Sequence, residues 1–320
     1  MTYPIHPDPE MKRRIENTVR AESHMCWTCG SCDFECPVNR ATGFLRPQKI
    51  VRMATLGLMD ELQHLPEVWY CLTCRRCNSV CPNQVKPAML IEYTRRQAIE
   101  SGFVTKERYA HYKALFALFQ RVRWHTIAHV MHNEITSISH DQWCKWLEEP
   151  VTEESYTLTQ AQYGHANSNG FNRYNAFSPQ TCFTCGECSS ACPVSGERSV
   201  FDPRTIFRML TMGLIDRLKT SPSIWLCVQC QRCSESCCQN VKGHKIIGEL
   251  QRMAIESGAV DDYFPIRMAD ANRLIYNRLL DEIDMVFNFS ERQSIQPAPH
   301  YQPFLDSVFT PCNAVANMTA

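Results

Sequence analysis

The sequence predicts a mainly α-helical protein that consists of two tandem domains of the same kind. Helix start signals recur along the chain, with an Asp or Pro in the first turn, and no convincing run of alternating strand residues is present. The segment 26–104 also aligns without gaps onto 182–260, and about 34 of 79 positions are identical at an offset of 156. Such self-similarity indicates the duplication of one structural unit.

The helices can be predicted in order from their start and stop signals. The first runs from an Asp8 N-cap to about Ala21, because Met11, Ile15 and Val19 share one face. In both repeats the later helices begin at a Pro or Gly, and a left-handed Gly such as Gly57 or Gly213 follows them. These helices are expected over residues 47–57 and 203–213, over residues 87–101 and 243–257, and in shorter form after Ser221-Pro222.

A longer helix is predicted after the first repeat, and a linker follows it. The apolar stripe of the helix consists of Tyr109, Tyr112, Phe116, Phe119, Ile127 and Val130. The next residues contain EEPVTEES and GHANSNGFNRYN, which favour loops or an ordered wrap on a partner. We therefore expect a first domain with its tail helix over 1–132, a linker over 133–181, a second domain with its tail helix over 182–290, and a C-terminal extension over 291–320.

Composition excludes several classes of protein. With 33 basic and 33 acidic residues, the chain has no basic surface suited to nucleic acid. The opening MTYPIHPDPEMKRR lacks the apolar stretch of a secretory signal, and the most apolar long stretch, 114–131, is interrupted by Arg and His residues. We expect a cytoplasmic protein without a transmembrane segment, which could be peripheral to a membrane through a partner. A disulfide framework does not suit so long a chain.

Cysteine is the unusual residue, since the chain contains 19. Each repeat carries two runs of the form C-x2-C-x2-C-x3-C, so the four runs contain sixteen of these cysteines. Three thiolates at this spacing can bind three irons of one cubane, while the fourth is directed to a neighbouring cluster. The sequence therefore predicts four [4Fe-4S] clusters. Structural zinc is the alternative, but it usually uses C-x2-C pairs without a third cysteine at the next step.

By this crossing rule, each cluster takes three cysteines from one run and the last cysteine of the other run in the same repeat. The predicted sets are Cys26, Cys29, Cys32 with Cys81; Cys71, Cys74, Cys77 with Cys36; Cys182, Cys185, Cys188 with Cys237; and Cys227, Cys230, Cys233 with Cys192. The clusters would then also tie the two halves of each repeat together.

The motifs CxxCGxCxxxCPV, LGLxDxL and WxCxxCxxC resemble the C subunit of heterodisulfide reductase and related iron–sulfur domains of quinone-linked oxidoreductases. The resemblance covers about 26–102 and 182–258. It implies two tandem alpha-helical ferredoxin-like domains, each built around two [4Fe-4S] clusters. It also implies an electron-transfer role beside a catalytic partner with CCG motifs, together with a flavoprotein or a quinone-linked membrane subunit.

Several other residues allow more than one interpretation. Cys238 replaces the Pro that follows the other runs, and a small buried residue is favoured over an extra ligand. Cys144 and Cys312 lie outside the repeats and are expected to be core or free thiols. Trp69 and Trp225 are interpreted as core anchors near the clusters. Basic residues near the second run of each repeat could tune cluster potentials or form surface ion pairs; they are Arg76, Arg232, Lys86 and Lys242.

Two classes of function are consistent with these features. The first is a non-catalytic electron-transfer subunit, since every run supplies a complete ligand set and no nucleotide or hydrolase motif is present. The alternative is an iron–sulfur redox sensor or scaffold, in which the clusters hold the domains together. A self-contained enzyme that uses Cys238 is a weaker third hypothesis.

Overall fold

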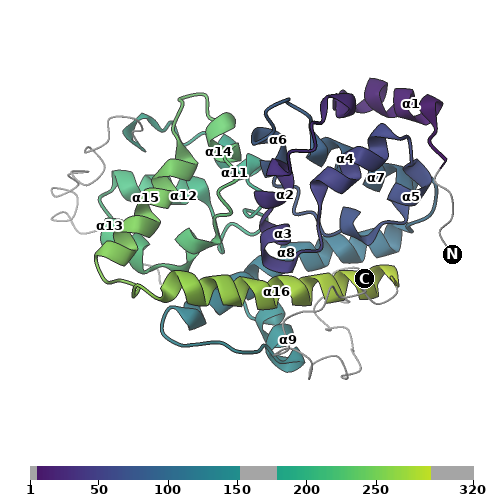
Figure 1. Cartoon of the computed structure of the whole chain (residues 1–320). Coiled ribbons are helices and arrows are strands. Elements are labelled where there is room, and N and C mark those ends of the chain that lie inside the picture. Colours follow the sequence, from purple (N-terminus) through teal and green to yellow (C-terminus); the bar gives the residue numbers. More distant parts are fainter. Residues whose placement is uncertain (1–5, 152–178, 290–320) are drawn as a thin grey trace.

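The computed structural model describes residues 6–151 and 179–289. Within these residues the regular structure is helical and contains no strand, which confirms the predicted fold class (Figure 1). In the same ranges, no helix has the length and apolar character needed to cross a membrane. The C-terminal extension, Cys312 and most of the predicted linker lie outside the described residues.

The two repeats have closely matching helix orders. The first contains α1 Pro9–Val19, η1 Ser23–Met25, α2 Ser31–Phe34, α3 Pro37–Thr42, α4 Pro47–Thr55, α5 Met59–Gln63, η2 Pro66–Val68, α6 Arg76–Ser79 and α7 Pro87–Glu100. The second contains η3 Pro179–Thr181, α11 Glu187–Ala191, α12 Pro203–Thr211, α13 Ile215–Thr220, η4 Pro222–Leu226, α14 Arg232–Glu235 and α15 Gly243–Glu256. The short helix expected after Ser221-Pro222 is present as η4. The other short helices beside the cysteine runs were not predicted, because so few residues carry no periodic signal.

The capping signals act as the sequence suggests. The Asp8 carboxylate accepts hydrogen bonds from the backbone N–H groups of Glu10 and Met11, and Asp202 accepts one from Arg204. Gly57 and Gly213 have φ angles of 76° and 77° just beyond α4 and α12. These stops confirm the predicted left-handed glycines.

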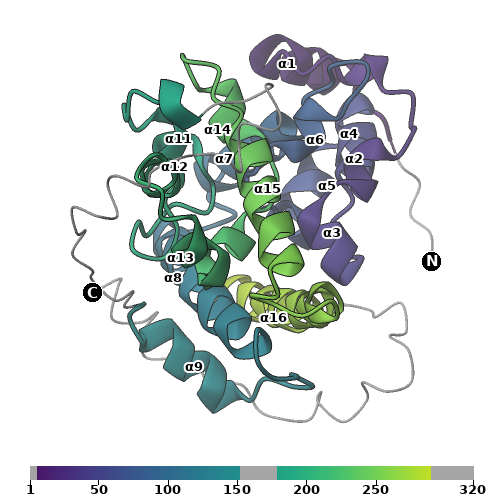
Figure 2. The ribbon, with the colours of Figure 1, turned by 90° about the vertical axis from the view of Figure 1, so that its left-hand side faces the viewer.

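Two long helices join the repeats. Helix α8 (Lys106–Val130) follows the first repeat and α16 (Phe264–Phe287) follows the second. They pack against each other, and both views place them below the two repeats (Figures 1 and 2). Each helix begins on its own repeat and ends on the other. For α8, Trp124 Nε1 donates to Ser223 Oγ of the second repeat at 3.2 Å.

In the same way, the C-terminal end of α16 packs against the first repeat. The Phe287 ring lies 4.3 Å from the Trp69 ring and 5.6 Å from the Tyr112 ring, measured between centroids. The Tyr70 hydroxyl donates to Asp284 Oδ1 at 2.5 Å, and burial raises the pKa of Asp284 to about 7. Each tail therefore belongs to the core of both repeats, while the domain limits themselves stay a prediction.

One part of the predicted linker is helical rather than looped. Helix α9 (His140–Glu148) packs against α8, and Trp143 and Leu147 are buried in the core of the first repeat. Its N-cap is Ser139, whose hydroxyl accepts from the backbone N–H of Gln142. The sequence analysis predicted loops or an ordered wrap for the linker and did not predict this nine-residue helix, whose three apolar anchors lie in a polar segment.

Gly57 permits a close approach between α1 and the end of α4. A Cβ at this position would lie 2.0 Å from the Asp8 carbonyl oxygen. We expect Gly57→Ala to lower the free energy of unfolding by about 2–5 kcal/mol, since left-handed strain adds to this overlap. Gly43→Ala is the matched control, because its φ angle is 77° and no atom lies within 4 Å of the added Cβ. Urea unfolding of the two variants measures the difference, and equal losses would contradict this role of Gly57.

Candidate metal centres

Each of the four cysteine runs forms a loop with the same backbone conformation. The residues before and after the second cysteine have positive φ angles in every run, between 52° and 90°. These residues are Thr28 and Gly30, Thr73 and Arg75, Thr184 and Gly186, and Gln229 and Gln231. Only two of the eight are Gly, although a left-handed conformation costs other residues about 1–2 kcal/mol. Sequence reasoning missed this conformation, because the two glycines were its only signal.

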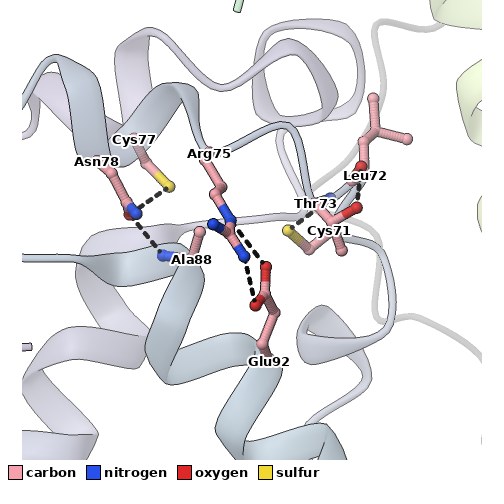
Figure 3. A network of polar contacts seen from close by, with 8 residues as sticks. All are labelled: Cys71, Leu72, Thr73, Arg75, Cys77, Asn78, Ala88 and Glu92. Atoms are coloured by element: carbon pink, nitrogen blue, oxygen red, sulfur yellow. Dashed lines mark hydrogen bonds and ion pairs between the residues drawn. The ribbon is translucent and has the colours of Figure 1, made fainter. Parts of the chain in front are cut away.

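This loop conformation turns backbone N–H groups toward the sulfur atoms. The N–H of the third residue donates to the first cysteine in three runs: Thr28 to Cys26 at 3.4 Å, Thr73 to Cys71 at 3.3 Å, and Thr184 to Cys182 at 3.4 Å. Figure 3 shows the second of these contacts, together with the ion pair of Arg75 and Glu92 beside it. Successive N–H groups of this kind form concave anion-binding nests, which recur at iron–sulfur sites.

One cavity in each repeat is lined by all four cysteines of a predicted crossed set. We call these the outer sets: Cys26, Cys29, Cys32 and Cys81 in repeat 1, and Cys182, Cys185, Cys188 and Cys237 in repeat 2. The fourth cysteine of each set comes from the end of the other run, although it lies far away in sequence. Cys29 and Cys185 are exposed, so both outer sets reach the surface.

The remaining cysteines form two inner sets, Cys36, Cys71, Cys74 and Cys77 in repeat 1, and Cys192, Cys227, Cys230 and Cys233 in repeat 2. Burial, followed by the charges of Cys71, Cys74 and Cys36, raises the pKa of Cys77 well above its ordinary value. Burial and the nearby Cys230 and Cys233 raise the pKa of Cys192 to about 12. The thiols of each inner set therefore lie close enough to affect one another's ionisation.

Electrostatic coupling also connects the sets to one another. Burial is the main cause of the raised pKa of each inner thiol. The charge of an outer cysteine adds to it: Cys32 also raises the pKa of Cys77, and Cys188 also raises the pKa of Cys233. Across the repeats, Cys230 contributes to the raised pKa of Cys74. The packing agrees, because Cys233 also lines the outer cavity of repeat 2 and Cys230 lies in the same hydrophobic core as Cys74. The order in space is outer, inner, inner, outer, and it differs from the order along the chain.

The residues fit an iron–sulfur cluster better than a single ion. Within 6–151 and 179–289, no three His, Cys, Asp or Glu side chains converge closely enough to hold one metal ion. The four cysteines of each outer set instead line one cavity. Buried thiols with mutually raised pKa values are costly as free thiolates, and a multi-iron core supplies the positive charge that offsets their repulsion.

A buried arginine beside the inner set of repeat 1 was not predicted from the sequence. Arg95 on α7 donates to the carbonyl oxygens of Val68, Trp69 and Cys71 at 2.8, 3.2 and 2.8 Å. Gln251, at the equivalent position of repeat 2, donates to the Ile224 carbonyl at 2.9 Å. Both repeats thus keep a hydrogen bond to the equivalent carbonyl oxygen, but the donor is charged in repeat 1 and neutral in repeat 2. Only the alignment of the two repeats could have indicated this difference.

Other residues interpreted from the sequence have mixed outcomes. Trp69 and Trp225 are buried, as expected of core anchors. Arg76 is ion-paired with Glu35. Cys238 is exposed at the outer cavity of repeat 2, so the expectation of a buried residue was wrong.

Cys144 also differs from its prediction. It lies on α9 and is disulfide-bonded, so the expectation of a core or free thiol was wrong. The sixteen cysteines of the four runs are free thiols, as expected if disulfides do not form the framework.

The comparison with protein families agrees with this arrangement. The sequence model of the 4Fe-4S dicluster domain matches residues 22–85 and 178–241. The chain is similar to the 4Fe-4S dicluster domain in both repeats. It is therefore an iron–sulfur protein with four [4Fe-4S] clusters, two in each repeat.

Curated relatives carry related names. The C subunit of the H(2):CoB-CoM heterodisulfide,ferredoxin reductase of Methanothermobacter thermautotrophicus is 34% identical over 97 residues, which cover 30% of this chain and 52% of the relative. The iron–sulfur C subunit of the CoB–CoM heterodisulfide reductase of Methanopyrus kandleri is 32% identical over 108 residues, covering 32% and 56%. A protein of Archaeoglobus profundus named as similar to the heterodisulfide reductase C subunit is 33% identical over 97 residues, covering 29% and 52%. The chain thus spans about half the length of these relatives.

The crossed sets can be tested by iron loss. We expect about sixteen irons per wild-type chain and about twelve in Cys81→Ala, because the cluster of the first run loses its fourth thiolate. Cys29→Ala should cause the same loss, and the double variant should lose no more. Cys81→Ala combined with Cys71→Ala should lose two clusters. Additive iron loss in the first double variant, or stoichiometric zinc, would contradict the crossing.

Arg95 offers a test of charge near the inner set of repeat 1. We expect Arg95→Gln to lower the midpoint potential of that cluster by tens of mV, since a tenfold change in a one-electron equilibrium is about 59 mV. The reverse change, Gln251→Arg, should raise the potential in repeat 2. Redox titration followed by electron paramagnetic resonance (EPR) measures both. An unchanged potential in both variants would show that these charges are screened.

Proposed function

We propose that this protein is an electron-transfer subunit of a heterodisulfide-reductase-like oxidoreductase complex. It relays electrons through four [4Fe-4S] clusters between a flavin- or quinone-linked module and a CCG-type catalytic subunit. The sixteen cysteines of the four runs are the ligands, in the crossed sets. The observation that carries this proposal is that Cys230, of the inner set of repeat 2, packs in the core that also holds Cys74 of the other inner set.

The chemistry of the sites supports transfer rather than substrate conversion. Each set has four cysteines, so every iron of a cubane can have a protein ligand and none is kept open for a substrate. The clusters supply one-electron redox chemistry when bound. The chain's own residues bury most of the inner thiols away from water, place N–H groups near the sulfurs, and set the local charge.

The two ends of this order offer docking positions for two partners. Trp27 is 71% exposed and Phe183 is 69% exposed, at equivalent positions of the repeats, and each lines an outer cavity. Exposed large aromatics are favoured at protein interfaces. Met25 and Phe34 extend the apolar surface at the first end only. The two ends therefore differ, which suits two different partners. A cytoplasmic location, peripheral to a membrane through a quinone-linked partner, is consistent with this arrangement.

Electron flow to a partner tests this function. We expect the dithionite-reduced protein to stay reduced alone under anaerobic conditions and to be reoxidised by a CCG-type subunit supplied with its disulfide substrate. Reoxidation is measured by cluster absorbance. Cys29→Ala and Cys185→Ala each interrupt one outer set and should block transfer at one end. If neither partner class exchanges electrons with the protein, while cluster loss abolishes partner binding, the sensor or scaffold function is supported instead.

A further inference from the structure

The two inner sets face each other across the interface between the repeats, at one guanidinium group. Arg76 Nε and Nη2 donate to Glu35 Oε2 at 3.0 and 2.6 Å, within repeat 1. Its Nη1 donates to the carbonyl oxygen of Gln229 in repeat 2 at 2.5 Å. This single side chain therefore contacts both repeats through hydrogen bonds.

The sequence neighbours of these three residues are cysteines of the inner sets. Glu35 precedes Cys36, and Arg76 precedes Cys77. Gln229 precedes Cys230, which packs in the core of the first repeat together with Cys74. The guanidinium thus joins the chain segments that hold the two inner sets.

A second contact supports the same interface. Ser79 Oγ donates to Glu235 Oε1 at 2.9 Å, between α6 and α14, and Figure 1 shows these two helices facing each other. In repeat 2 the equivalent of Glu35 is Ala191, so the residue that matches Arg76, Arg232, lacks the corresponding carboxylate. Only repeat 1 therefore supplies an Arg–Glu pair to this interface, and the duplication did not produce a second one in repeat 2.

We propose that electrons pass between the repeats directly from one inner cluster to the other, and that Arg76 is the positioning residue that holds the two at transfer distance. In the step, one electron leaves the inner cluster of one repeat, which is oxidised, and enters the inner cluster of the other, which is reduced. No bond forms or breaks and no proton moves. Electron tunnelling falls steeply with distance, so a small opening of this interface slows the step. The inference rests on the proposed relay function.

The magnetic interaction between the inner clusters tests the proposal without any partner. We replace two ligands of each outer set by alanine, at Cys26, Cys29, Cys182 and Cys185, so that only the inner clusters remain in the full chain. After dithionite reduction we expect EPR splitting from two interacting paramagnetic clusters. Adding Arg76→Gln should remove or strongly weaken the splitting while the iron content stays the same.

Arg75→Gln is the matched control for charge. It removes the same charge from the neighbouring position, but Arg75 is ion-paired with Glu92 inside repeat 1, so the splitting should persist. If the outer-cluster variant does not retain iron, the same comparison of Arg76→Gln and Arg75→Gln is made in the protein with all four clusters. The proposal is overturned if the inner clusters do not interact, or if Arg76→Gln leaves the interaction unchanged. A failure of partner transfer with this splitting intact would overturn the relay function alone.

Discussion

The structure depends on bringing together two cysteine runs that begin 45 residues apart. Each crossed set needs three thiols from one run and a fourth from the other, as in the cavity that joins Cys26 and Cys81. The helices between the runs act as the spacer that meets this requirement. Within it, α4 and α7 pack together, and Gly57 lets α4 end directly against the start of α1. The packing of the hydrophobic core therefore also positions the cysteines of the metal sites.

Charge is the second constraint. A [4Fe-4S]2+ core with four thiolates carries about −2, so four clusters add about −8 to a chain that is formally neutral. Most inner thiols are buried, where an uncompensated charge is costly. The nests of the left-handed loops and the buried Arg95 place positive dipoles and charge where this cost is highest. The balanced overall composition thus surrounds anionic sites at the centre.

The exchange of tail helices makes two repeats into one structure. Because α8 ends on the second repeat and α16 ends on the first, neither repeat completes its core alone. The same exchange holds the inner sets against each other, with Arg76 and Gln229 at the interface. A single dicluster domain would hold two clusters, whereas the duplicated chain holds four. In the proposed relay, the duplication would lengthen the path between the two exposed ends.

The sequence by itself determined the duplication, the helical class and the number of clusters, and it predicted the crossed sets of cysteines. These follow from local patterns, since thiolate spacing, helix caps such as Asp8 and left-handed glycines act over a few residues. Only the tertiary structure decided the order of the sets, the exchange of α8 and α16, the helix α9 within the linker, and the contacts of Arg76 and Arg95. Each of these depends on residues far apart in sequence, and the packing that joins them leaves no periodic signal in either segment.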